Sequence, residues 1–550
     1  MAQDAPKQVA TPAVLQAGTA SDKGLKGGAL GLMSSIVVGT ASTAPAYSLA
    51  ATLGFVVAIV GVKAPAIMVL AFVPMYLIAV AYQELNRAEP DCGTTFTWAS
   101  RAFGPWVGWL GGWGIIAADV IVMANLAQIA GSYSYQLVGA DSLANSTFWS
   151  TVAGVVWIII MTYICYRGIE VSARIQYALL GAELVVLAAF AIIALAKVYG
   201  GSAPAGSLHP SASWFVPSGI GVSDLATATL LAVFIYWGWD TAVACNEETA
   251  NPDTTPGRAA ILSTFLLLGI YAVVTVAAVS FAGVGTKGIG LGNENNATDV
   301  FKALGPTVFG KGTTGSIFEA LLIISVLTSA SASTQTTILP TARTALSMGA
   351  YRAIPTRFAA IHLRYLTPTW ATVGMGIVSI VFYVGLTTVS DSILADSIGA
   401  VGLMIAFYYG MTGFACVWYY RRDLGKGGRD MLMKGILPFL GGLILLAAFL
   451  KAAYDYSKPD YGSTSLGGVG GVFIVGIGAL VLGAVLMFAY SRVDPPFFRG
   501  ETLVPGRPDL LLTPDGMVAT VGLPDSGQMP TVIAPDRSNL PPGREPYDPS

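Results

Sequence analysis

Three acidic side chains stand inside long apolar stretches of this chain. Asp119, Glu183 and Asp240 all have mainly apolar neighbours along the sequence. An uncompensated carboxylate within a bilayer is strongly unfavourable, so intramembrane acids face a cavity, a partner or an ion pathway. Such a group can bind a cation or carry a proton, and these three are the first candidates for function.

Two apolar segments, residues 29–60 and 225–250, are interrupted near their middle. The first interruption begins with Gly39, Thr40, Ala41, Ser42 and Thr43 and ends at Pro45. The second consists of Tyr236, Trp237, Gly238, Trp239 and Asp240. Backbone groups freed inside a bilayer need partners, so such breaks line a cavity. One broken segment in each half of a chain indicates a secondary transporter with its binding site between the breaks.

The composition is that of a multi-pass membrane protein. Of its 550 residues, 54% are hydrophobic and 11% are charged, and the mean hydropathy is +0.66. Soluble domains carry about 25% charged residues. Twelve segments are long enough to cross a bilayer. They cover residues 30–60, 64–82, 103–131, 148–166, 173–198, 225–249, 259–284, 316–339, 370–388, 393–419, 435–453 and 467–490.

An even number of spans places both termini on one side, and charge identifies that side. If the termini are inside, the inner loops hold 22 of the lysines and arginines and the outer loops hold 7. Positive charge concentrates in cytoplasmic loops, so both termini are expected in the cytoplasm. We expect a cytoplasmic segment 1–28, a core 29–420, two further helices in 421–492 and a disordered cytoplasmic tail 493–550.

Other classes of chemistry find no support. The four cysteines are scattered without a CxxC pair, and the two histidines lie in expected loops. We therefore expect neither a bound metal nor a cofactor, and no enzyme activity. The net charge of −2 and the absence of a basic run argue against nucleic acid as a partner.

Several strings resemble the amino acid–polyamine–organocation (APC) permeases. Residues 82–85 read YQEL, 90–98 read PDCGTTFTW, 101–109 read RAFGPWVGW, 247–252 read EETANP and 343–348 read RTALSM. Their order matches that family over about residues 30–420. The resemblance implies an all-α membrane fold of twelve helices. It also implies a five-plus-five inverted repeat with helices 1 and 6 broken, two peripheral helices, and alternating access to one central site.

The resemblance places substrate on the two breaks, with one departure. Amino acid transporters of that family carry G-[ST]-G in helix 1, where backbone amides meet the substrate carboxylate. Here the second glycine is Ala41, whose Cβ restricts close backbone approach, and Ser42 and Thr43 offer hydroxyls instead. The alternative for this segment is a simple kink at Pro45 whose freed carbonyls bond to nearby hydroxyls.

Each acid has two readings. Burial favours a neutral carboxyl group, so Glu183 could carry a proton or make a structural hydrogen bond; some APC members have a lysine there. Asp240 could couple protons or recognise an amine, as the resemblance implies, or could cap the following half-helix. Asp119 could bind a cation or ion, or could join helices through hydroxyls.

The sequence leads to three hypotheses about function. The first is import of an amino acid across the plasma membrane with protons as the coupling ion. The second is transport or exchange of an amine or polyamine, indicated by the three acids and the missing glycine. The third is a solute sensor without transport. At the cytoplasmic ends, we expect ion pairs of a gate or of a loop, and not substrate ligands, from Glu84, Glu247, Glu248 and Arg258.

Overall fold

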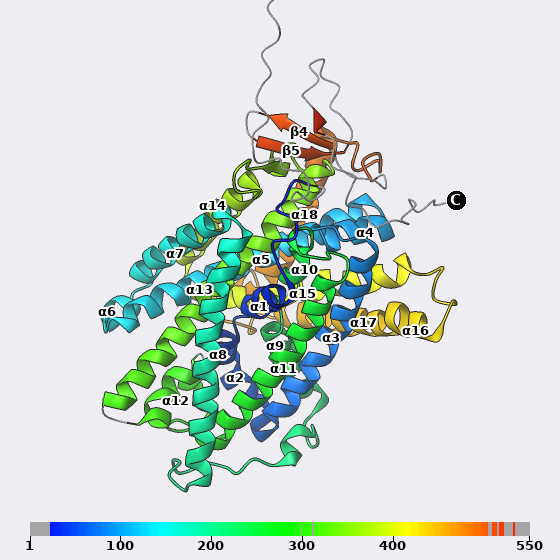
Figure 1. The fold of residues 1–550 in the computed structure, drawn as a ribbon. Helices are drawn as coiled ribbons and strands as arrows, with labels where there is room; N and C mark the ends of the chain where they lie inside the picture. The colour runs from blue at the N-terminus through cyan, green and yellow to red at the C-terminus, as the bar shows by residue number, and fades with distance from the viewer. Residues whose placement is uncertain are drawn as a thin grey trace, which may run out of the picture.

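The protein is an α-helical bundle with a small sheet at one end (Figure 1). The computed structural model describes residues 23–297, 299–310, 313–503, 509–513, 516–521 and 532–533. Within those residues, ten helical stretches are long and apolar enough to cross a membrane. The expectation of an all-α membrane protein is therefore confirmed.

The α-helices of the first half are α1 (Leu32–Ser42), α2 (Pro45–Val60), α3 (Ala64–Ala88), α4 (Thr95–Phe103), α5 (Pro105–Leu137), α6 (Asp141–Ala144), α7 (Thr147–Arg167) and α8 (Ile169–Tyr199). Those of the second half are α9 (Val222–Ile235), α10 (Thr241–Ala244), α11 (Thr255–Ala282), α12 (Val300–Phe309), α13 (Thr313–Ala350), α14 (Thr369–Val389) and α15 (Asp391–Tyr419). Three more follow, α16 (Gly428–Asp430), α17 (Leu437–Tyr456) and α18 (Gly471–Val493).

Short elements connect these helices. The 3-10 turns are η1 (Gly61–Lys63), η2 (Ala212–Phe215), η3 (Asn246–Glu248), η4 (Glu294–Asn296) and η5 (Thr356–Ala359), and η6 (Met431–Ile436) is a π-helical stretch. The strands are β1 (Ala360–Ile361), β2 (Ser465–Leu466), β3 (Val469–Gly470), β4 (Asp509–Thr513), β5 (Gly516–Thr520) and β6 (Val532–Ile533).

The bundle has a buried centre and an apolar outer surface. The helices α5 and α13 pack along each other, and in the most apolar 18-residue stretch of each 78% is buried inside the structure. The corresponding share in α18 is 22%. The outer helices expose apolar side chains such as Val481, Val381 and Ile159. Contiguous apolar surface on many outer helices is what a lipid environment requires, so the chain is a multi-pass membrane protein.

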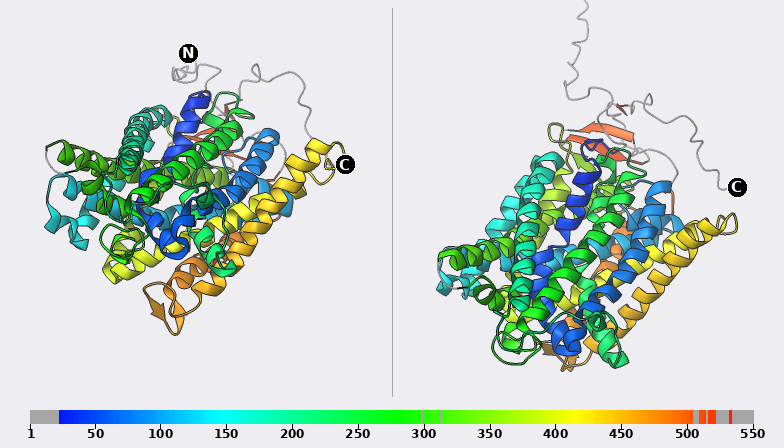
Figure 2. Two further views of the ribbon diagram at one scale, coloured as in Figure 1. Left: turned by 90° about the horizontal axis from the view of Figure 1, so that it is seen from below. Right: turned by 60° about the horizontal axis from the view of Figure 1, so that its bottom comes forward.

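Both expected breaks are present, and the first is shorter than predicted. Gly39 to Ser42 remain helical as the last turn of α1, so only Thr43 and Ala44 separate α1 from α2. Ala44 adopts the left-handed conformation at φ 46°, and Pro45 begins α2, a position that proline favours. Figure 2 shows α1 and α2 (blue) running through the middle of the bundle.

The second break opens at Tyr236 and gives way to a very short helix. Gly238 has φ +120°, a conformation available essentially to glycine. The second half, α10, has only four residues before η3. Each of the two broken spans therefore consists of two helices, α1 and α2 for the first and α9 and α10 for the second.

The predicted disorder of 493–550 is wrong for the described part of that tail. Phe497 and Phe498 are buried, and β4 and β5 form an antiparallel pair. β5 also pairs with β1, in the loop between α13 and α14, with Met517 opposite Ile361. We call the end of the bundle that carries β1, β4 and β5 the strand end (Figure 1). Residues 504–508, 514–515, 522–531 and 534–550 lie outside the described part.

Candidate functional site

The two breaks touch each other in the middle of the molecule. A Cβ at Gly238 would lie 2.8 Å from the carbonyl carbon and oxygen of Ser42. A Cβ at Gly39 would lie 3.1 Å from the carbonyl oxygen of Trp239. The close approach requires glycine at 238 and leaves little room for a Cβ at 39, so these residues bring the two predicted site segments together.

Hydroxyl groups join the breaks to α13. The hydroxyls of Ser42 and Thr241 are 2.9 Å apart, and Ser333 donates to the Ser42 carbonyl at 2.9 Å. Ser333 belongs to a serine- and threonine-rich part of α13. In this structure that part of α13 makes hydrogen bonds to other helices.

The start of α2 is already occupied by protein groups. The Ala46 amide donates to Oε1 of Glu183 at 2.6 Å, and the Tyr47 amide donates to the Ser329 hydroxyl at 3.2 Å. The next amide, Ser48, donates to the Ala44 carbonyl at 2.8 Å. Because proline has no N–H, the first turn of α2 keeps no amide for a ligand.

Glu183 reaches this helix start from α8 and is fully buried. Its Oε1 also accepts a hydrogen bond from Ser329 at 2.9 Å, while Oε2 has no hydrogen-bond partner. Glu183 forms none of the ion pairs found among the described residues. The positive end of a helix dipole is the group that stabilises this carboxyl.

Asp240 faces aromatic residues on the other side of the breaks. Tyr408 of α15 donates to Oδ2 of Asp240 at 3.0 Å, and the indole N–H of Trp237 donates to the same Tyr408 hydroxyl. The Asp240 side chain makes no cap bond to α10. The alternative in which Asp240 caps the following half-helix is therefore wrong for the side chain.

Asp119 is held by a hydroxyl of α13. Thr341 donates to Oδ2 of Asp119 at 2.5 Å, and the carboxyl groups of Asp119 and Asp240 interact electrostatically. This hydrogen bond fits the structural reading of Asp119, in which the acid joins two helices. Asp119 and Asp240 therefore lie within electrostatic range of each other.

The aromatic residues of the second break are buried. Tyr236 donates its hydroxyl to the Met68 carbonyl at 3.0 Å. Trp239 packs between Tyr82 and Tyr409, with ring centroids 5.2 Å from each, and its indole N–H has no partner. That indole is a buried donor without a hydrogen-bond partner in the second break.

A buried ionic cluster, which we call the lysine lock, closes the strand end. The ammonium of Lys23 lies 2.8 Å from Asp91 and 2.5 Å from Glu247. Asp91 also accepts hydrogen bonds from Ser347 at 2.7 Å and from Tyr351 at 3.1 Å. Asp91, Cys92 and Glu247 could together hold a cation, and the Lys23 ammonium occupies that position. The lock thus joins the N-terminal segment, the loop after α3, η3 and α13.

A second buried ion pair lies beside the lock. Arg343 donates through two nitrogens to the two oxygens of Glu248, each at 2.8 Å, and both side chains are fully buried. The expectation that Glu247 and Glu248 form ion pairs is confirmed. The partners Lys23 and Arg343 were not predicted, although a lone arginine close to an apolar segment is a signal for a buried acid.

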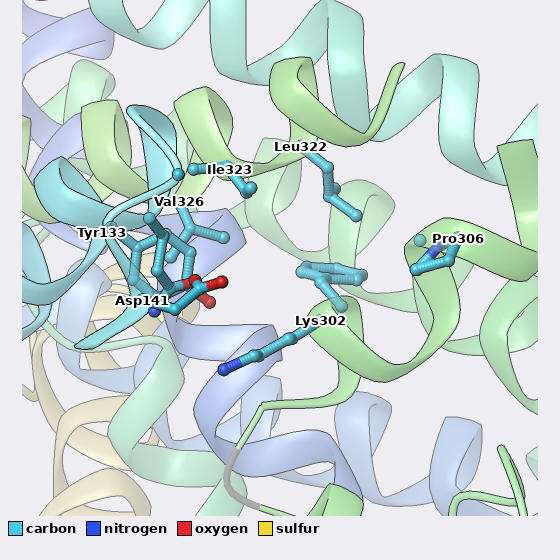
Figure 3. Close-up of a pocket in the computed structure, with 11 residues that line it drawn as sticks. Tyr133, Asp141, Lys302, Pro306, Leu322, Ile323 and Val326 are labelled. Carbon is cyan, nitrogen blue, oxygen red and sulfur yellow. The ribbon is translucent and has the colours of Figure 1, made fainter. Parts of the chain in front are cut away.

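A cavity of about 310 Å³ (Figure 3) lies beside α12, away from the strand end of the bundle (Figure 1). It opens between the end of α5, α6, α12 and the first half of α13. Asp141 and Lys302 place opposite charges at its wall, and Tyr133 and Phe301 add aromatic surface. Neither break lines this cavity, so it is a separate feature on the side away from the lysine lock.

Comparison with known proteins identifies this architecture. A model of the amino acid permease family matches residues 29–466, which include both breaks and all three acids. The chain belongs to the amino acid permease family. The resemblance found in the sequence motifs is thereby confirmed, and the permease is a transporter by family.

Its relatives carry different substrates in their names. The permease is 27% identical over 37% of its length to the branched-chain amino acid permease BcaP of Lactococcus lactis subsp. cremoris, covering 45% of that protein. It is 23% identical to the arginine/ornithine antiporter of Latilactobacillus sakei, over 69% of this chain and 76% of the relative. It is 22% identical to the low-affinity putrescine importer PlaP of Escherichia coli K12, over 77% of this chain and 88% of the relative.

Breaking the lysine lock is expected to open the strand end of the permease. Removing one partner of a buried charge cluster costs about 3–5 kcal/mol, and each 1.4 kcal/mol is about a tenfold change in population. In a variant with Cys92 as the sole cysteine, Lys23→Met should therefore raise the rate of Cys92 alkylation about tenfold or more. Lys26→Met, which removes only a surface pair with Glu170, is the matched control. Equal alkylation rates in both variants would contradict the lock.

The lock should be insensitive to pH over the physiological range. Burial would raise the pKa of Asp91, but the Lys23 ammonium and the bonds from Lys23, Gly93 and Ser347 lower it to about 2, from 3.8. Burial opposes the charge on Lys23, but Asp91 and Glu247 raise the pKa of Lys23 well above 10.5. Stabilisation by Asp91 is complete above about pH 4 and is lost toward pH 2, and that by Lys23 is lost only above pH 10.5. Cys92 alkylation, corrected for thiolate content, should not change between pH 5.5 and 8.

Proposed function

We propose that this permease imports an amino acid across the plasma membrane, coupled to protons. In this proposal the chain has twelve spans, with helices 1 to 10 forming a five-plus-five inverted repeat and α17 and α18 outside it. Both termini lie in the cytoplasm. Helix 1 consists of α1 and α2, and helix 6 consists of α9 and α10.

The observation that supports the proposal best is the contact between the two breaks, with acids around it. Gly238 against Ser42 puts both broken helices at one point, as a central site between repeats requires. Asp240 belongs to the second break, Glu183 bonds to the start of α2 just after the first break, and Asp119 lies within electrostatic range of Asp240. No lysine or arginine of the described chain pairs with these three acids. Buried acids without cationic partners suit proton binding, because they are neutral or charged according to what surrounds them.

The two ends of the bundle fit alternating access. The lysine lock closes the strand end, which is cytoplasmic in this proposal. The other end, which is the outer one in this proposal, carries a cavity that neither break lines, so access from the outside requires a movement of the outer half. Opening the lock while the outer half closes over the substrate would expose the same site to the other side.

Uptake by the purified permease in proteoliposomes tests the proposal. Labelled amino acids are supplied outside, with and without an imposed pH gradient that is alkaline inside. We expect accumulation that depends on the gradient and collapses with a protonophore. If an amino acid is taken up at the same rate with and without the gradient, the proposal of proton coupling is wrong. If no amino acid is taken up, the proposed substrate class is wrong.

An amine or polyamine is the second candidate substrate. It is favoured by the three acids and by the Glu183 carboxyl on the Ala46 amide, where a substrate carboxylate would otherwise bind. Competition decides between the candidates. If amines without a carboxylate inhibit uptake as strongly as amino acids do, the carboxylate contributes nothing to recognition and the amine becomes the substrate.

A further inference from the structure

We infer that Glu183 is a built-in competitor for the carboxylate of the substrate at the start of α2. The inference rests on the proposed amino acid substrate. In this account, proton coupling arises because the substrate carboxylate displaces the Glu183 carboxylate from the Ala46 amide. Glu183 must take up a proton and leave that amide before the substrate carboxylate can bind there.

The hydrogen bonds at the start of α2 define the competition. A helix N-terminus offers unpaired amides and a positive dipole end to an anion. Here the Ala46 amide contacts Oε1 of Glu183 at 2.6 Å, and the Tyr47 amide is taken by Ser329. Pro45 has no amide to offer, and the Thr43 and Ala44 amides bond to the carbonyls of Thr40 and Ala41. A ligand carboxylate can gain a backbone donor in this turn only by displacing a protein group.

The second oxygen of Glu183 shows that this side chain is poised for exchange. Oε2 is buried and has no hydrogen-bond partner, while Oε1 receives both bonds from Ala46 and Ser329. When only one oxygen of a buried carboxylate accepts hydrogen bonds, these bonds offset little of the free energy lost on removal from water. Once it leaves the helix start it loses the charge-assisted bond from Ala46 as well, so it must leave as the neutral acid.

Among the described residues, no lysine or arginine forms an ion pair with Glu183. Tyr47 of α2 and Tyr271 of α11 are the titratable groups of the adjacent turns, and Tyr271 interacts electrostatically with Glu183. On α13, Arg343 is 14 positions beyond Ser329, about 21 Å along the helix. Other charged or titratable residues of the helices that pack on α8 are Tyr163, Cys165, Tyr166, Arg167, Arg258, Lys302 and Glu319.

The proton balance follows directly. From the outer side, one proton adds to the Glu183 carboxylate, the neutral side chain releases the Ala46 amide, and the substrate carboxylate takes its place. On the inner side the substrate leaves, Glu183 loses the proton and its carboxylate returns to the amide. Each carboxylate carried therefore brings one proton, and the proton binds first.

Calorimetry of the full-length permease measures this exchange. An amino acid that the proteoliposome assay shows to be a substrate is titrated in two buffers of different ionisation enthalpy. Where Glu183 is ionised, wild type should take up about one proton per substrate bound, and its Kd should rise about tenfold per pH unit. Glu183→Gln, a neutral isostere, should take up none, and its Kd should be independent of pH. Its pH-driven accumulation should be lost, while exchange of internal for external substrate continues.

The controls separate this inference from the proposed function. Glu170→Gln changes an exposed acid at the start of the same helix and should keep the proton uptake and the pH dependence. If Glu183→Gln binds substrate with unchanged proton uptake, the competition is wrong although proton-coupled transport stands. If Glu183→Gln weakens binding and carboxylate-free amines bind as well as amino acids, Glu183 is a fixed ligand for a cation and the inference is overturned. Size-exclusion chromatography establishes that each variant is folded.

Discussion

Alanine in place of Gly238 is expected to reduce uptake by at least about tenfold. Gly238 has φ +120°, where a side chain is strained, and an added Cβ would lie 2.8 Å from backbone atoms of Ser42. The strain costs about 1–3 kcal/mol and the overlap a similar amount, and 1.4 kcal/mol corresponds to a factor of about ten. The two broken helices would then be unable to meet. Initial uptake rates and the thermal unfolding midpoint of the purified variant measure the effect.

Gly269 supplies the matched control for that substitution. It lies in the middle of α11, and an added Cβ would find no atom within 4 Å outside the backbone of its own helix. Gly269→Ala should therefore transport like wild type and be at least as stable, since alanine is the better helix former. Equal transport by Gly238→Ala and Gly269→Ala would show that the contact between the breaks does not matter.

Methionine in place of Arg343 is expected to destabilise the protein by about 3–5 kcal/mol. The substitution leaves Glu248 buried and charged, without the two hydrogen bonds that Arg343 donates at 2.8 Å. We expect a clearly lower thermal unfolding midpoint and lower yield from the membrane. Loss of the pair also removes the link between η3 and α13 beside the lysine lock.

A double variant identifies the cause of that loss. Arg343→Met with Glu248→Gln has no buried charge at this place, so it should regain most of the stability lost by Arg343→Met alone. If the double variant is as unstable as Arg343→Met, the lost arginine packing matters and the uncompensated charge does not.

The course of the helices could be read from the sequence because the bilayer sets the length of each apolar run. The predicted span 467–490 became α18, Gly471–Val493, and 103–131 became part of α5, Pro105–Leu137. The acids were also found from sequence, since a carboxyl group within such a run is conspicuous. The extent of the first break could not be predicted from sequence. Residues such as Gly39 and Ser42 can be helical or unwound, and their packing against the second break determines which conformation they adopt.

The partners of the candidate residues could not be predicted. Glu183 meets Ala46 from 137 positions away, and Lys23 meets Glu247 from 224 positions away. Lys23 stands in a polar segment without periodicity, which gives no sign of burial. The pairing of β5 with β1 brings a short tail strand to a loop between two helices, and five-residue strands carry little signal without their neighbours.

Substrate protection of a cysteine in the first break tests the central claim, that the paired breaks bind the substrate. The native cysteines are replaced, and Ser42→Cys or Thr43→Cys is introduced, whichever retains uptake. At a substrate concentration ten times the Kd, alkylation should slow about tenfold by mass action. A cysteine at Leu466, which is exposed in β2, should react at the same rate with and without substrate. If saturating substrate leaves the alkylation rate in the first break unchanged while uptake continues, the substrate binds elsewhere and the account is contradicted.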